Sequence, residues 1–375
     1  MNRVLSSLPE DPRPDPGGAV PDAVAGHLRA RVRRWRRTFL ALAFLLAGSA
    51  VFGVSVGAVT VRPATIVRVL WHRMAGGPAG AWTPADEAII LRVRLPRVAA
   101  GALAGAALAV AGVLFQGLLR NPLADPYIIG TSAGAAFAAA VAQAAGLQFT
   151  LFGFGVLPVA GFAGGLATSF AVYGLARIGG RAPVVNLLLA GLVVSSILLY
   201  AMSLLMVLSE TLQTQFRSLF TVLMGGIIVT GWRPVAIVAP LVAAGIAAAC
   251  PLARRLNALT LGEEGAAAVG VDVERDKRLI IGLGAFLTAC AVSLSGIIGF
   301  AGLVVPHVLR LTAGPDHRGL IPGAALLGGA FLVVADALAR SLFAPAEVPV
   351  GVFTALVGGP FFLVILRRGR GEYRF

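Results

Sequence analysis

Lysine is almost missing from this chain of 375 residues, because arginine supplies all but one of its 31 basic side chains. The exception is Lys277, which follows Asp276. A loop that cradles nucleotide phosphates ends in Gly-Lys and then Ser or Thr, and this lysine cannot belong to one. We therefore do not expect the chain to hydrolyse ATP by itself.

Metal-ligating side chains are also scarce. The four histidines are dispersed, and Cys250 and Cys290 both lie in apolar runs. A zinc ion needs His and Cys clustered at short spacing, whereas these cysteines are typical of small packed residues. We interpret His307, which follows Pro306 near a helix end, as a structural residue. We predict no catalytic residues, no metal site and no cofactor bound by this chain.

Charge is the third shortage. Charged residues make up 13% of the chain and hydrophobic residues 58%, with a mean hydropathy of +0.87. An average soluble domain is about 25% charged and about 45–50% apolar, so these values indicate an integral membrane protein. The net charge of +14 comes from arginines in the tails and between apolar runs, as topology signals do. We therefore expect no nucleic-acid partner.

The apolar runs predict an all-α membrane protein with about ten transmembrane helices. The expected segments are Phe39–Val61, Val98–Leu118, Tyr127–Ala145, Phe152–Ala176, Val184–Leu208, Val235–Leu252, Leu279–Ile298, Leu303–Leu311, Pro322–Ala339 and Val350–Leu366. The eighth is too short for a full span and begins near Pro306, which is typical of a half helix. We interpret residues 1–35 as a disordered, basic, cytoplasmic tail, 36–370 as the transmembrane domain and 371–375 as a cytoplasmic C-terminal tail.

The stretch Arg254–Arg278 carries ten charges between two apolar segments. Neither lipid nor a packed membrane bundle accommodates that density, so we expect the stretch to lie in water. The count of spans places it in the cytoplasm. Within it, Leu261–Val271 is predicted to form a short helix with small residues on one side, which is suited to docking in a groove on another protein.

A weak internal repeat is visible. In two places an arginine is followed by a glycine 18 residues later and by a proline ten residues further on. These residues are Arg94, Gly112 and Pro122, and Arg278, Gly296 and Pro306. The predicted topology makes the two copies run in opposite directions, which is typical of transporters with inverted repeats, although a chain rich in glycine also produces such matches by chance.

Ionisable residues near the spans leave two interpretations open. Six arginines between Arg62 and Arg97 would lie outside the cell, against the usual bias, and an acidic docking partner is one reason to keep them. Asp336 stands four residues before Arg340, a spacing that favours a helical ion pair, neutral as a unit. A structural pair and a functional pair fit this spacing equally well.

Six motifs occur in one order and resemble the iron-siderophore, haem and cobalamin permease family of bacterial ABC importers, the vitamin B12 permease type. They are RLPR (Arg94–Arg97), NPLADP (Asn121–Pro126) with GTSAG (Gly130–Gly134), LGEE and VG within Leu261–Gly270, GFAGLVVPH (Gly299–His307), DHR (Asp316–Arg318) and AEVPVG (Ala346–Gly351). The resemblance covers roughly residues 36–370.

The resemblance implies a type II ABC importer permease, the transmembrane subunit of an importer for an iron chelate (siderophore), haem or cobalamin. It also implies a homodimer with the pathway on its two-fold axis, two cytoplasmic ATPase subunits that bind ATP and Mg, and a periplasmic or lipoprotein substrate-binding protein. The subunit would lie among lipids in the bacterial inner membrane, with both termini cytoplasmic. The metal chelate would cross by alternating access, driven by the partner ATPase.

Matched residue by residue, the resemblance assigns two sets of contacts. The residues for coupling to the ATPase are Leu261, Gly262, Glu263, Glu264, Ala266 and Gly270, and those for docking of the binding protein are Arg94, Arg97 and Arg340. Arginine suits this second role because it pairs with carboxylates in a bidentate, orienting geometry. Contact with lipid headgroups and capping of helices are the competing interpretations of these arginines.

The cytoplasmic gate departs from the vitamin B12 permease, whose turn into the fifth helix carries small hydroxyl residues. Here Pro183, Val184 and Val185 precede Asn186, and an apolar constriction can gate by excluding water. Other pathway candidates are polar residues within spans, which also serve as interhelical hydrogen-bond partners. They are Gln116, Thr131, Ser132, Ser195, Ser196 and Tyr200.

An ion-coupled secondary transporter or channel that works without an ATPase is the alternative class. It needs an ionisable group on the pathway, for which the spans offer Asp336 and Arg310. A membrane-embedded enzyme would need a catalytic constellation, and we find none in the sequence.

Overall fold

The computed structural model describes residues 22–57, 61–77, 80, 82–227, 229–342, 344 and 346–368. The predicted C-terminal tail and the first 21 residues of the predicted N-terminal tail lie outside this part. From Asp22 onward the chain is helical, so the helix begins inside the segment interpreted as a disordered tail. The cause is local, because Pro21 is the last proline of that region and the residues after it are mainly Ala, Leu and Arg, which favour helix.

Helices dominate the described part of the chain, with one short hairpin. In order, the elements are α1 Asp22–Ser55, α2 Pro63–Ala75, α3 Pro84–Ala88, a π-helical stretch Ile89–Arg94, α4 Leu95–Leu118, α5 Thr131–Ala144, β1 Thr150–Leu151, β2 Phe154–Gly155, α6 Val156–Ala176, α7 Val184–Leu208, α8 Glu210–Thr214, α9 Phe216–Met224, α10 Trp232–Ala249, a 3-10 turn Cys250–Leu252, α11 Ala253–Leu259, α12 Glu263–Ala268, α13 Val273–Ser295, α14 Ala301–Ala313, α15 His317–Ser341 and α16 Val350–Arg368.

Each of the ten predicted apolar segments coincides with one of these helices, which confirms the fold class. Among the described residues, seven helices are long and apolar enough to span a membrane, while α14 and most of α16 are apolar but shorter. The short eighth segment is confirmed as α14, which has 13 residues and contains Pro306. The third segment begins late, at Thr131, because residues 125–130 form turns that end at Gly130, whose φ is +83°.

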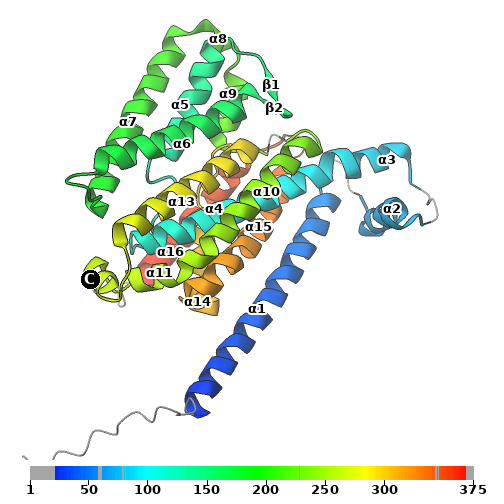
Figure 1. The fold of residues 1–375 in the computed structure, drawn as a ribbon. Coiled ribbons are helices and arrows are strands. Elements are labelled where there is room, and N and C mark those ends of the chain that lie inside the picture. The colour runs from blue at the N-terminus through cyan, green and yellow to red at the C-terminus, as the bar shows by residue number, and fades with distance from the viewer. Residues whose placement is uncertain are drawn as a thin grey trace, which may run out of the picture.

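Helix α4 forms the centre of the bundle and packs against α13, α15, α14 and α10 (Figure 1). The approach is close because glycines face each other. A Cβ on Gly105 would collide with the carbonyl of Gly328 on α15, and one on Gly112 would collide with the carbonyl of Gly302 on α14. This is how small residues let membrane helices pack backbone to backbone.

Helices α5, α6 and α7 form a second group, drawn in green in Figure 1, with α8 and α9 beside them. Helix α7 packs on α5 and α6 with one side only. Its other side is an exposed apolar face of large side chains. This exposed face of α7 includes Val185, Leu189, Leu192, Ile197, Tyr200 and Leu204.

The residues of the proposed repeat occupy different local settings. Gly112 lies inside α4, whereas Gly296 follows the end of α13 with a φ of +61°. Pro122 lies in the turn after α4, and Pro306 lies inside α14. The inverted repeat therefore stays a prediction from the sequence.

Candidate functional site

The charged stretch forms one end of the bundle, which we call the charged end. It consists of α11, α12 and the beginning of α13. The predicted helix Leu261–Val271 is shorter than expected, because Gly262 and Gly270 on either side of α12 have φ values of +95° and +84°. Ala266 is buried, while Leu261, Glu264 and Val269 are exposed. Helix α12 therefore anchors one side in the protein and presents the other outward.

Two charges of this stretch are buried, which corrects the expectation that all ten lie in water. Asp276 is paired with Arg255 of α11. Lys277 lies 2.8 Å from Glu263 of α12 and 3.0 Å from Glu274 of its own helix. The protein accommodates these buried charges because each has a hydrogen-bonded partner of opposite sign.

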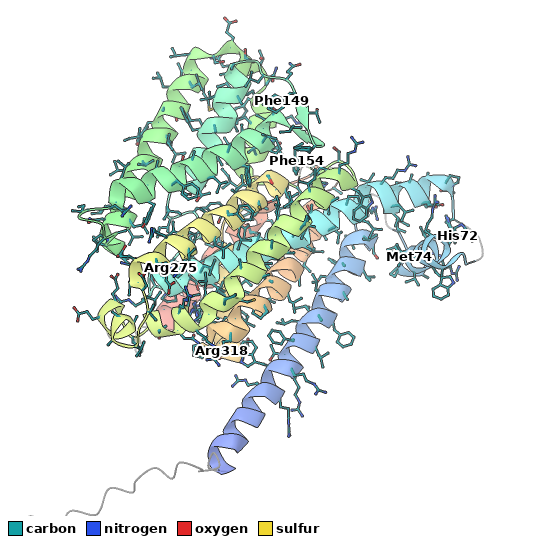
Figure 2. The ribbon with its side chains drawn as sticks, viewed as in Figure 1. His72, Met74, Phe149, Phe154, Arg275 and Arg318 are labelled. Carbon is teal, nitrogen blue, oxygen red and sulfur yellow. The ribbon has the colours of Figure 1, made fainter. Side chains whose placement is uncertain are left out.

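A polar contact ties the charged end to α15. The side-chain amide nitrogen of Asn257 donates to Asp316 at 2.6 Å, and the side-chain oxygen of Asn257 accepts from the backbone N–H of His317 at 3.1 Å. Asp316 also accepts from the N–H of Arg318, and so caps the first turn of α15. The DHR motif thus positions α11 against the start of α15, near which Figure 2 labels Arg318.

Two further motifs pack against each other beside α4. The hydroxyl of Tyr127, which follows NPLADP, accepts from the N–H of Ile298, just before GFAGLVVPH. A Cβ on Gly302 would collide with Pro126. In the loop between α4 and α5, burial raises the pKa of Asp125 to about 6, opposed by a hydrogen bond from the N–H of Tyr127. These motifs therefore have a packing role.

At the opposite end of the bundle, two of the predicted docking arginines hold the end of α1. Arg94 is buried and donates to the carbonyl of Val54 at 2.7 Å. Arg340 is also buried and donates to the carbonyl of Gly53 at 3.0 Å. Cations at these final carbonyls satisfy groups that have no partner within the helix. Capping of α1 thus accounts for Arg94 and Arg340.

The third arginine, Arg97, belongs to an ion-pair cluster with Asp336. Arg97 lies 3.0 Å from Asp336 and 3.2 Å from Glu347, and Arg340 lies 2.9 Å from the other oxygen of Asp336. The side chain of Asp336 is only 2% exposed, whereas that of Arg97 is 21% exposed. The expected pair of Asp336 and Arg340 exists, and Arg97 is the more exposed of the two arginines that contact Asp336.

The predicted pathway residues are distributed over helices α4, α5 and α7. Gln116 is buried, accepts from Arg310 at 2.6 Å and donates to the carbonyl of Leu303. Thr131 is buried against Ser169 of α6, with 2.8 Å between the hydroxyl oxygens. These two polar groups make interhelical contacts. The remaining candidates, Ser132, Ser195 and Ser196, are half-buried.

The four residues predicted as the gate, Pro183, Val184, Val185 and Asn186 (the gate stretch), lead into the exposed face of α7. Pro183 and Val185 are exposed, and Val184 and Asn186 are half-buried. Farther along the helix, Tyr200 is exposed. The stretch lies at the charged end, next to α13, because Glu274 accepts a hydrogen bond from the N–H of Ala182.

A cavity of about 580 Å³ opens at the end of the bundle opposite the charged end, between the hairpin, α6 and α8–α9. Phe149, which Figure 2 labels, lines it beside Gln143 and Gln215. Among the described residues, no group of three or more His, Cys, Asp or Glu side chains is arranged to hold a metal ion.

The fold defines a multi-pass membrane protein with an exposed, charged surface at one end. The chain belongs to the FecCD transport family, whose sequence model matches residues 40–368. It is thus a transport subunit and not an enzyme.

Two similar permease proteins and one solved transporter structure support this assignment. The chain is 45% identical to the cobalamin import system permease protein BtuC of Halobacterium salinarum, over 75% of this chain and 74% of that protein. It is 42% identical to the hemin transport system permease protein HmuU of Yersinia pestis, over 76% and 84%. A solved structure described as a metal-chelate type ABC transporter, inward-facing, superposes with a TM-score of 0.76 at 31% identity, covering 89% of this chain and 99% of that one.

Proposed function

We propose that this chain is the permease subunit of an ATP-binding cassette importer for a metal chelate, namely an iron chelate, haem or cobalamin. The observation that carries the proposal is α12, a short helix at the charged end with one side buried and the other presented to a partner. Relatives named for cobalamin and hemin transport support the substrate class. The rival, an ion-coupled carrier, has weaker support because Asp336 is held between two arginines.

The partners follow from the surfaces. Two cytoplasmic ATPase subunits, which bind ATP and Mg and hydrolyse the nucleotide, would each receive one α12. A second copy of this chain would cover the exposed face of α7, so that the pathway lies between two α7 helices and opens alternately to either side. Arginines in the first 37 residues and after α16 support a topology in which both termini would lie in the cytoplasm and the subunit in the plasma membrane.

The native mass of the complex tests this assembly. We expect two copies of this chain to copurify with two copies of an ATPase encoded beside it. A subunit that purifies alone and still moves solute across vesicles would contradict the proposal and favour the ion-coupled carrier.

Glu264 tests the docking surface of α12. It is exposed, whereas the partly exposed Glu263 is paired with Lys277. We expect Glu264→Arg to weaken ATPase binding about tenfold, equivalent to about 1.4 kcal/mol, in a titration of detergent-purified permease with ATPase. The matched control is Glu210→Arg in α8 at the opposite end, which should leave binding unchanged. Equal affinities in the two variants would exclude Glu264 from the interface.

Docking of the substrate-binding protein is tested at Arg97, the partly exposed arginine of the cluster. An acidic side chain of that protein would compete with Glu347 for this guanidinium. We therefore expect Glu347→Gln to tighten capture of the binding protein a few-fold and Arg97→Gln to weaken it about tenfold, measured by surface plasmon resonance on the reconstituted complex. Changes in the same direction for both variants would argue against docking at this arginine.

A further inference from the structure

Lys277, the sole lysine of the chain, is buried, and its ammonium group has a hydrogen-bond acceptor for each of its N–H groups. Lys277 is 3% exposed. Its Nζ donates to Glu263 at 2.8 Å, to Glu274 at 3.0 Å and to the backbone carbonyl of Ala182 at 3.1 Å. An ammonium group has three N–H donors, and here each has an acceptor.

The backbone N–H and the backbone carbonyl of Ala182 are both hydrogen-bonded to side chains of α13. Its carbonyl accepts from Lys277, and its N–H donates to Glu274 at 3.1 Å. Ala182 is 2% exposed and directly precedes Pro183, after which α7 begins. Helix α7 itself packs on α5, α6 and α8. The pair of Lys277 and Glu274 thus fixes the entry of α7 to the charged end.

We propose that Lys277 is a positioning residue that couples α12 to α7, so that displacement of α12 moves the entry of α7 with it. The proposal rests on the proposed function, in which α12 receives the ATPase. Glu263 carries the displacement from α12, Lys277 and Glu274 transmit it, and Ala182 delivers it to the gate stretch.

Lysine suits this position for a chemical reason. Burying an ion pair brings little net stability, and apolar residues often pack such a site as well or better. An apolar side chain, however, could not bind two carboxylates and a backbone carbonyl at once. The lysine therefore contributes a directional connection among three separate segments, strengthened by the low local dielectric.

The test measures movement of α7 in the assembled complex, without any cargo. The parent carries Leu189→Cys on the exposed face of α7, with Cys250→Ser and Cys290→Ala. The probe is N-ethylmaleimide, and its labelling rate is measured with and without ATP plus vanadate. We expect ATP to change the rate in the parent by roughly 5- to 150-fold, the usual range of coupling between two sites, and Lys277→Met to remove that change while the ATPase still copurifies.

Arg275→Met is the matched control, because it removes the same charge from the same turn of α13 at an exposed side chain, labelled in Figure 2. It should respond as the parent does. A full response in Lys277→Met would overturn the proposal. If that variant fails to assemble, Glu274→Gln decides, since its amide keeps an acceptor for Lys277 but loses the one for the N–H of Ala182; a parent-like response there would likewise overturn it. A parent without any response would instead contradict the proposed function.

Discussion

Replacing Asp336 by asparagine should lower the free energy of unfolding by about 3–5 kcal/mol, the cost of leaving buried charges without their partner. Asp336 is the carboxylate that both Arg97 and Arg340 contact, and Arg340 is buried. Asparagine keeps the shape of the side chain but cannot neutralise either guanidinium. Detergent-purified protein should therefore unfold at a clearly lower temperature, as followed by intrinsic tryptophan fluorescence.

Glu347→Gln provides the matched control, because it makes the same chemical change at the other carboxylate that contacts Arg97. The Glu347 side chain is 62% exposed, and exposed pairs contribute about 0–1 kcal/mol. We expect its melting temperature to stay close to that of the parent. If the Asp336→Asn and Glu347→Gln variants unfolded at the same temperature, the cluster around Asp336 would not stabilise the end of α1 as its geometry indicates.

The second large effect concerns the crossing of α4 and α15. Gly105→Ala adds one methyl group where the carbonyl of Gly328 already occupies the space. Neither backbone can yield without moving a whole helix, so we expect a loss of about 1–3 kcal/mol, as for overpacked cores. The measurement is the detergent concentration, or the temperature, at which half of the protein is unfolded.

Gly48→Ala in α1 is the control for helix propensity. A Cβ there meets nothing within 4 Å, so the change should stabilise the helix by about 0.5–1 kcal/mol, the difference between Gly and Ala in a helix interior. The two identical substitutions are thus expected to act in opposite directions. A neutral Gly105→Ala would show that the two helices do not cross at the distance seen in the structure.

The helices of this fold could be predicted from the sequence because long apolar runs have few alternatives in a membrane. Even the short α14 was visible, through Pro306 and the brevity of its run. Helices α2, α8 and α9 were not predicted, since they are short, lie between the spans and have no long apolar signal of their own. The helical residues after Asp22 were missed because the prolines and charges before them dominated the composition of that region.

The contacts of the candidate site residues could not be predicted from the sequence, and their functional roles stay predictions. Glu263 and Glu264 are neighbours in one motif, yet one turns to Lys277 and the other faces outward, which depends on where α12 begins. Arg94, Arg97 and Arg340 were predicted to share one docking role, but the sequence did not reveal that Arg94 and Arg340 cap α1. Asp336 and Arg97 are 239 positions apart, and no periodic pattern links residues so distant in the chain.

The burial of Lys277 leaves the subunit without an exposed lysine side chain for acylating reagents. Succinimidyl esters attack exposed, uncharged amines, and this chain offers one lysine side chain, enclosed by two carboxylates and a carbonyl. In a complex treated with such an ester, lysines of other subunits would be tagged while Lys277 stays unmodified. Because Lys277 is proposed to keep α12 and the entry of α7 together, it should stay unmodified under turnover as well, and tagging there would show that the two separate.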